Sequence, residues 1–225
     1  MSVNNRVVSS FKKHGATGQP IVLAVSGGPD SQAMLKCVGH LRGRLKVDPV
    51  AVGIDHGLRR AAGGELDLAE GLAKELGVPF VRRVVHVDQS GSLQAAARNA
   101  RYEALLEEAD AVGARYVVTA HHWDDRAETV LFRLLRGRGI GSLAIMPPVS
   151  GRIFRPLLGA RHEELLEYCR RWDLSYALDP SNEDDKYTRV LIRRKILPML
   201  EEISPQLRSR LNDLGDEALR LTSTT

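Results

Sequence analysis

Short apolar runs alternate along the chain with longer stretches in which apolar residues recur at helical spacing. The runs predict strands at 21–25, 49–54, 80–87 and 115–120, with a fifth, edge strand at 153–158. Helices are expected between them, from Ser31 onward, over 65–76 and 92–109, and from about 124 to 136. This alternation predicts an α/β fold, in which a doubly wound, mainly parallel five-stranded sheet has helices on both faces.

The pattern changes after residue 158. Helical spacing covers 161–171, returns over 188–200 until Pro198 perturbs it, and begins again after Pro205. We therefore predict an α/β domain over 1–158 and a C-terminal helical extension of the same domain over 159–225.

Three polar segments follow the ends of predicted strands. They are SGGPDS at 26–31, DHGLR at 55–59 and HHWDD at 121–125. In open parallel sheets, ligands bind outside the carboxyl ends of the strands. We therefore expect these three segments to form one site.

Composition is typical of a globular protein, with 43% hydrophobic and 27% charged residues. No window approaches eighteen consecutive apolar residues, and the N-terminus lacks the apolar core of a secretory signal. These features predict a cytoplasmic location and no contact with a membrane. Cys37 and Cys169 are far apart and form no Cys-x-x-Cys pair, so no disulfide framework is expected.

Positive charge is concentrated in one segment. The net charge is +4, and residues 126–155 contain six arginines, a single acid (Glu128) and no lysine. A solvated face would account for this segment, but the exclusive use of arginine favours recognition of phosphate or planar groups.

The composition of the SGGPDS loop points to an anion-binding site. Gly27 and Gly28 let the backbone approach a ligand closely and take positive φ, while the following helix adds the positive end of its dipole. The hydroxyl groups of Ser26 and Ser31 add donors. Asp30 would repel a phosphate unless a Mg²⁺ ion lies between them, and the alternative is that Asp30 caps the helix.

Two acids follow the fourth predicted strand. Asp125 and Glu128 are three residues apart at a helix start and face the same way, so they can bind Mg²⁺ or grip and deprotonate an amine. Asp124 is expected to be the N-cap. No further cysteine or histidine lies at ligand spacing from His121 and His122, so a zinc site is not expected.

The loop SGGPDS resembles the PP-loop of the N-type ATP pyrophosphatases. Five later segments resemble elements of the lysidine synthase family within that group. In order, they are IDHGLR at 54–59, LQAAAR with RY at 93–102, HHWDDRAETV continuing to LLRG at 121–137, RPLL at 155–158 and DPSN at 179–182. The resemblance covers roughly residues 20–200 and implies an adenine nucleotide alpha hydrolase-like fold.

The resemblance implies a two-step ligation that requires ATP and Mg²⁺. The C2 oxygen of the wobble cytidine of an isoleucine tRNA with a CAU anticodon is adenylated, and free L-lysine then attacks C2 and releases AMP. The resemblance assigns catalysis to Asp30, Asp125, Glu128 and Arg189. It assigns ATP to Ser26, Gly27, Gly28, Pro29, Asp30, Ser31 and His56, and Mg²⁺ to Asp30 and Asp125.

The same resemblance implies contacts to tRNA or phosphate from five arginines: Arg59, Arg98, Arg101, Arg136 and Arg193. The family segment T-R-N-R-I-R departs here, because Val190 and Leu191 replace two polar residues between Arg189 and Arg193. The family's further C-terminal tRNA-binding domains are not expected in this chain. Two alternative functions are a tRNA thiolase and a nucleotide- or RNA-binding protein without turnover. The oligomeric state is left open, with a homodimer as one possibility.

Overall fold

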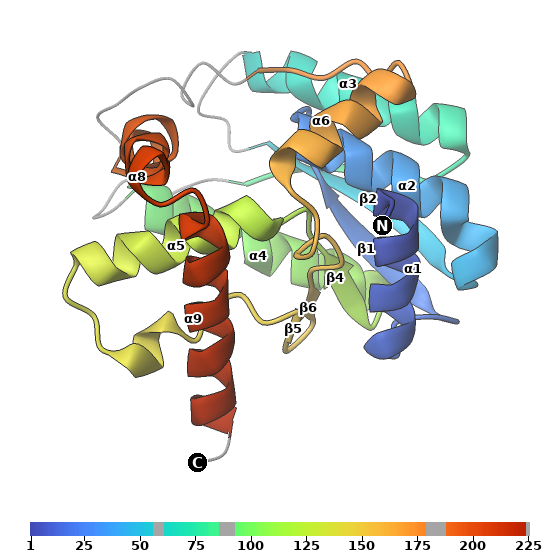
Figure 1. Ribbon diagram of the computed structural model, residues 1–225. Helices are drawn as coiled ribbons and strands as arrows, with labels where there is room; N and C mark the ends of the chain where they lie inside the picture. Colours follow the sequence, from blue (N-terminus) through green and yellow to red (C-terminus); the bar gives the residue numbers. More distant parts are fainter. Residues whose placement is uncertain (56–60, 86–92, 179–187, 224–225) are drawn as a thin grey trace.

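A six-stranded sheet forms the centre of the molecule (Figure 1), with the strand order β3-β2-β1-β4-β6-β5. This computed structural model describes residues 1–55, 61–85, 93–178 and 188–223. The strands are β1 (Pro20–Val25), β2 (Asp48–Asp55), β3 (Phe80–Val84), β4 (Tyr116–Val118), β5 (Val149–Ser150) and β6 (Ile153–Phe154). All neighbouring pairs are parallel except β5 with β6.

The predicted α/β class with a mainly parallel sheet is therefore confirmed, and its strand count was one too low. The missed strand, β5, has only two residues and forms a hairpin with β6. The predicted strand at 153–158 ends at Phe154, because the Arg155 N–H donates outside the β4 pairing, to the Pro148 carbonyl at 2.8 Å, and Pro156 has no N–H to donate.

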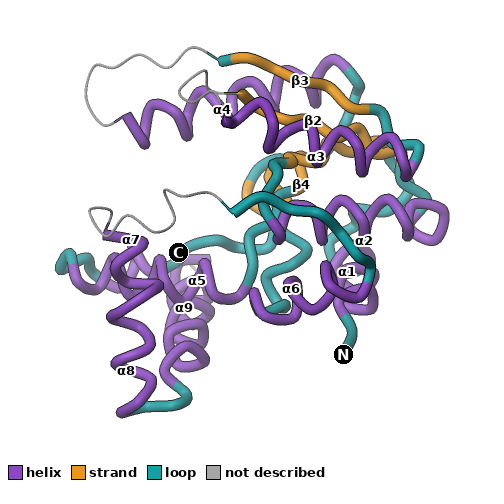
Figure 2. The backbone as a smooth tube through the Cα atoms, turned by 90° about the horizontal axis from the view of Figure 1, so that it is seen from above, coloured by secondary structure: helices purple, strands orange, loops and turns teal. Residues whose placement is uncertain are grey.

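Helices cover both faces of the sheet (Figures 1 and 2). One face carries α1, α2, α3 and α6, and the opposite face carries α4. Their bounds are α1 (Val3–Lys13), α2 (Pro29–Leu45), α3 (Ala61–Leu76), α4 (Leu93–Ala111) and α6 (His162–Arg171). Across the described ranges, every helix is too short or too polar to cross a bilayer.

Successive side chains of β1 enter different cores. Ile21, Leu23 and Val25 belong to the cluster beneath α1, α2 and α6, whereas Val22 and Ala24 belong to the cluster beneath α4. Alternation with a period of two places successive strand residues on opposite faces, and both sets are apolar here. This explains why the strand appears in the sequence as an unbroken apolar run.

A third apolar cluster lies beside the sheet and joins the C-terminal helices to α5 (Figure 1). Its elements are α5 (Trp123–Leu135), the 3₁₀ turn η1 (Ile140–Leu143), the π-helical segment η3 (Ile192–Ile196), α8 (Leu197–Ile203) and α9 (Leu207–Ser223). A short helix, α7 (Thr188–Leu191), leads into η3. Ala127 and Val130 of α5 pack here with Leu211 and Ala218 of α9. The helix that follows β4 therefore anchors the C-terminal helices next to the carboxyl edge of the sheet.

Pro198 perturbs the helical chain after residue 188, as the sequence indicated, but does not end it. The turn before it widens into η3, in which the Leu197 N–H reaches the Ile192 carbonyl five residues back. A proline ring clashes with the carbonyl four residues earlier and leaves it without a donor, and a π-helical turn relieves both problems.

Candidate active site

The loop at 26–31 joins the end of β1 to the first turn of α2. The Ser26 N–H donates to the Ser31 hydroxyl at 2.7 Å, and the Gly28 N–H lies 3.4 Å from the Ser26 hydroxyl. Gly28 is the N-cap of α2 with a φ of −73°, and neither Gly27 nor Gly28 has a positive φ. The expectation of positive φ was therefore wrong, because extended backbone suffices at an N-cap.

Gly27 is needed for packing. A Cβ atom built on Gly27 would lie 2.4 Å from the Glu65 carbonyl oxygen, so α3 passes too close for any side chain. The Gly27 carbonyl accepts the Ala177 N–H at 2.8 Å. The loop is thus held from two sides by segments distant in sequence, which fixes its amide groups at the start of α2.

Asp30 lies between two histidines. Its Oδ1 is 2.8 Å from His162 Nδ1, and its Oδ2 is 3.4 Å from His122 Nε2. The two imidazole rings have centroids 5.3 Å apart and are inclined by 31°. Asp30 does not cap α2, because Gly28 holds that position.

Asp30 and His122 carry opposite charges that stabilise each other. Burial alone would raise the pKa of Asp30, but hydrogen bonds and charge from His122 and His162 outweigh burial and hold that pKa below its usual range. Burial alone would likewise lower the pKa of His122, but its contacts with Asp124, Asp30 and Asp125 raise that pKa to about 10. At neutral pH the site therefore holds a buried imidazolium surrounded by carboxylates.

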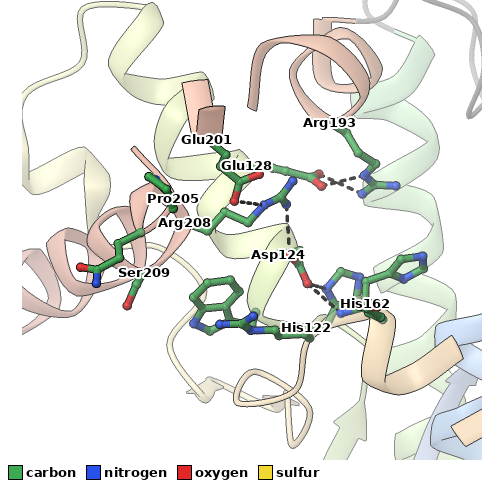
Figure 3. A pocket seen from close by; sticks show the side chains of 13 residues that line it. His122, Asp124, Glu128, His162, Arg193, Glu201, Pro205, Arg208 and Ser209 are labelled. Atoms are coloured by element: carbon green, nitrogen blue, oxygen red, sulfur yellow. Dashed lines mark hydrogen bonds and ion pairs between the residues drawn. The ribbon is translucent and has the colours of Figure 1, made fainter. Parts of the chain in front are cut away.

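Asp124 ties three helices together (Figure 3). Its Oδ2 accepts the His162 N–H at 2.7 Å, and its Oδ1 accepts from Arg208 of α9 at 3.1 Å. Burial would raise the pKa of Asp124, but these contacts and His122 lower it to about 2. The expectation that Asp124 caps α5 was wrong: His122 is the N-cap, and its N–H donates to Asp125 Oδ2 at 3.0 Å.

Asp125 and Glu128 share one partner, Arg193 of η3. Arg193 Nε and Nη2 lie 2.7 and 2.9 Å from the two Glu128 oxygens (Figure 3). Nη2 is also 3.3 Å from Asp125 Oδ1. Burial raises the pKa of Glu128 despite this partner. Two acids that the sequence grouped as catalytic and an arginine that it grouped with tRNA contacts thus form one cluster.

Three of the other predicted site arginines lie against aromatic rings. The guanidinium groups of Arg136 and Arg189 lie 4.3 and 5.6 Å from the centre of the Phe132 ring, and that of Arg98 lies 5.0 Å from the Tyr102 ring. Burial and the charge of Arg98 lower the pKa values of Arg101 and Arg189. A group of cations that repel one another in this way favours an anionic ligand.

Four of the six arginines in 126–155 form hydrogen bonds or ion pairs within the chain. Arg126 pairs with Asp216 at 2.5 Å, Arg133 donates to the Ser142 carbonyl, Arg152 donates to the Ala114 carbonyl at 2.7 Å, and Arg155 donates to the Pro147 carbonyl at 2.9 Å. The interpretation of this segment as a recognition surface therefore does not extend to these four side chains, which hold loops and helices in place.

A cavity of about 630 Å³ opens between the start of α5, the start of α6 and the C-terminal helices (Figure 3). Its lining includes His122, Asp124, Glu128, His162, Arg193, Glu201 and Arg208. Trp123 also lines it, with the Arg161 guanidinium 4.9 Å from the ring centre. His162, Glu201 and Arg208 are not predicted from the sequence, because each belongs to an element whose position in space no local pattern gives.

Two of the predicted site residues, His56 and Arg59, lie outside the described residues, as does DPSN at 179–182. Both cysteines are described and are fully buried. Cys169 Sγ lies 3.3 Å from the Pro29 carbonyl, at the start of α2. Burial raises its pKa to about 11, and that of Cys37 to about 12.

Comparison with known sequences identifies related proteins. The family model of the PP-loop domain matches residues 2–200. The tRNA(Ile)-lysidine synthase of Bacillus cereus is 38% identical over 200 residues, covering 84% of this chain and 42% of the relative. That of Rhodopseudomonas palustris is 42% identical over 194 residues, covering 83% and 54%. The chain thus spans about half the length of these relatives or less.

Solved structures share the fold. A U34-tRNA thiolase from Methanococcus maripaludis, determined with its 4Fe–4S cluster, superimposes with a TM-score of 0.80 at 16% identity, covering 99% of this chain and 79% of the thiolase. An NH₃-dependent NAD synthetase from Campylobacter jejuni gives a TM-score of 0.53 at 15% identity, with coverages of 96% and 93%.

Proposed function

The chain belongs to the PP-loop domain family, and on that premise we propose that it ligates lysine to the wobble cytidine of an isoleucine tRNA at the expense of ATP. The single observation that carries the proposal is the convergence of Asp30, from the PP-loop, with Asp125 and Glu128 beside one cavity. Relatives named tRNA(Ile)-lysidine synthase, matched over four fifths of the chain, support the same reaction.

In this proposal the PP-loop holds the ATP phosphates. The first amide groups of α2 have no acceptor within their own helix, and the helix dipole favours an anion there. The carboxylates of Asp30 and Asp125 lie 3.4 and 3.5 Å from the same nitrogen of His122, so they converge on one point. Carboxylate oxygens are ligands that Mg²⁺ accepts, and the ion, when bound, neutralises charge on the phosphates.

The acids of α5 would serve the second step. Arg193 now lies where a substrate ammonium would be held, against Glu128 and Asp125. A lysine ε-ammonium must lose a proton before it attacks C2, and Glu128, whose pKa burial raises, is a suitable acceptor. The new C–N bond then forms as the bond from C2 to the adenylated oxygen breaks and AMP leaves.

The cationic side chains of Arg98, Arg101, Arg136 and Arg189 would contact tRNA phosphates. Such contacts give salt-dependent affinity without reading sequence. The relatives that match over four fifths of the chain carry the name tRNA(Ile)-lysidine synthase. The isoleucine tRNA with a CAU anticodon is therefore the partner to test first.

Pyrophosphate release tests whether the chain turns over ATP. With Mg-ATP and unmodified isoleucine tRNA, we expect release that depends on the tRNA and is lost in Asp30→Ala. ATP binding without tRNA-dependent release would instead identify a nucleotide-binding protein without turnover.

A thiolase is the alternative within the same superfamily, and the thiols disfavour it. Both are buried, and their raised pKa values leave little thiolate at neutral pH. Incorporation of labelled sulfur into tRNA, with no incorporation of lysine, would reverse this preference.

A further inference from the structure

Two histidines and an aspartate from three separate segments meet beside the PP-loop. Asp30 comes from the start of α2, His122 from the cap of α5 and His162 from the start of α6. One potential ligand atom from each lies within 4.8 Å of the other two. We propose that these three side chains form a binding site for a transition-metal dication of the Zn²⁺ type.

The spacing suits a small ion. Zn²⁺ binds nitrogen and oxygen at about 2.0–2.2 Å, which in a tetrahedron separates neighbouring ligand atoms by about 3.3–3.5 Å. Asp30 is already 2.8 Å from His162 Nδ1 and 3.4 Å from His122 Nε2. Asp125 Oδ2, 3.5 Å from the same His122 nitrogen, is close enough to become a fourth ligand.

A carboxylate also lies behind His122, where it can orient the ring for a metal. His122 is 3% exposed, and its Nδ1 has no hydrogen-bond partner, although Asp124 Oδ2 lies only 3.6 Å away. Histidines that bind a metal through one nitrogen usually donate the other N–H to a carboxylate, which fixes the ring. Arg208 and the His162 amide hold Asp124 in position for that role.

The donor set distinguishes this site from a magnesium site. Two imidazoles and one carboxylate suit Zn²⁺, Co²⁺ or Ni²⁺, whereas Mg²⁺ prefers oxygen ligands. A zinc site was not predicted from the sequence, because no third ligand lies near His121 and His122 along the chain. In the fold, His162 provides this ligand. Because Asp30 and Asp125 are also the proposed Mg²⁺ ligands, an ion bound at the cluster would compete with Mg²⁺ for these carboxylates, but its binding can be measured without ATP or turnover.

Cobalt absorption tests the site directly. Metal-free chain without an affinity tag is titrated with Co²⁺, whose visible absorption is intense in tetrahedral sites. We expect saturation at one ion per chain, displacement by Zn²⁺ and no displacement by excess Mg²⁺. His162→Ala should weaken Co²⁺ binding at least tenfold, because it removes a ligand. Asp124→Asn should weaken it by about 10–100-fold, because Asp124 orients the His122 ring.

His40→Ala is the matched control, because His40 is an exposed histidine outside the cluster, beside Trp172. It should bind Co²⁺ as the unaltered chain does. Thermal melts verify that each variant is folded, and His162→Gln replaces His162→Ala if the latter is not. The absence of visible absorption, or equal Co²⁺ affinity in the His162 variant and the His40 control, would overturn the proposal.

Discussion

At the scale of single residues, the site is a set of charges that balance one another. Glu128 has a side chain only 6% exposed, and Arg193 satisfies both of its oxygens. The spacing of Asp125 and Glu128 on one helix face was visible in the sequence, because it depends only on the helical repeat. The contact with Arg193 was not visible in the sequence, because residues 128 and 193 meet only through the packing of η3 on α5.

Arg193→Ala should lower the free energy of unfolding by about 1–3 kcal/mol, because it leaves a buried carboxylate without a partner. Arg193 is 46% exposed on its side chain, so the loss should fall below that of a fully buried pair. Urea denaturation measures it. Adding Glu128→Gln should recover part of the loss, and equal losses in the single and double variants would show that the pair contributes nothing.

At the scale of elements, the sequence predicted most strands and helices but missed α1. No helix was predicted for the N-terminal segment, which was considered only for a secretory signal. Val3, Val7 and Phe11 recur there at helical spacing, and all three are buried. Phe11 packs edge-on against Phe154, with ring centres 4.9 Å apart. This helix was therefore predictable from the sequence. The close packing of α3 on Gly27 was not, because it depends on a contact with residue 65, distant along the chain.

Gly27→Ala should disturb the junction of the PP-loop and α3. The added methyl group would overlap the Glu65 carbonyl, and such overpacking costs about 1–3 kcal/mol of stability. Gly28→Ala is the matched control in the same loop, since its Cβ would meet only the Ser26 hydroxyl, at 3.7 Å. Thermal unfolding of both variants tests this, and equal stabilities would contradict the packing role of Gly27.

In the molecule as a whole, the site lies between elements that three separate apolar clusters hold in place. The two clusters on the sheet fix Asp30 at the carboxyl edge, and the third brings α8, α9 and η3 against α5 (Figures 1 and 2). The α/β class followed from strand–helix alternation. The position of the C-terminal helices could not be predicted in this way. Helical periodicity shows which face of a helix is buried, but not which element packs against that face.

The activity proposed for this chain is the ATP-dependent ligation of lysine to the wobble cytidine of an isoleucine tRNA. Its most direct test is nucleoside mass spectrometry of isoleucine tRNA (CAU) after incubation with the chain, Mg-ATP and isotopically labelled lysine. We predict a labelled lysine adduct on the wobble cytidine that requires ATP. An unmodified cytidine, under conditions in which the Bacillus cereus relative modifies the same tRNA, would contradict the account.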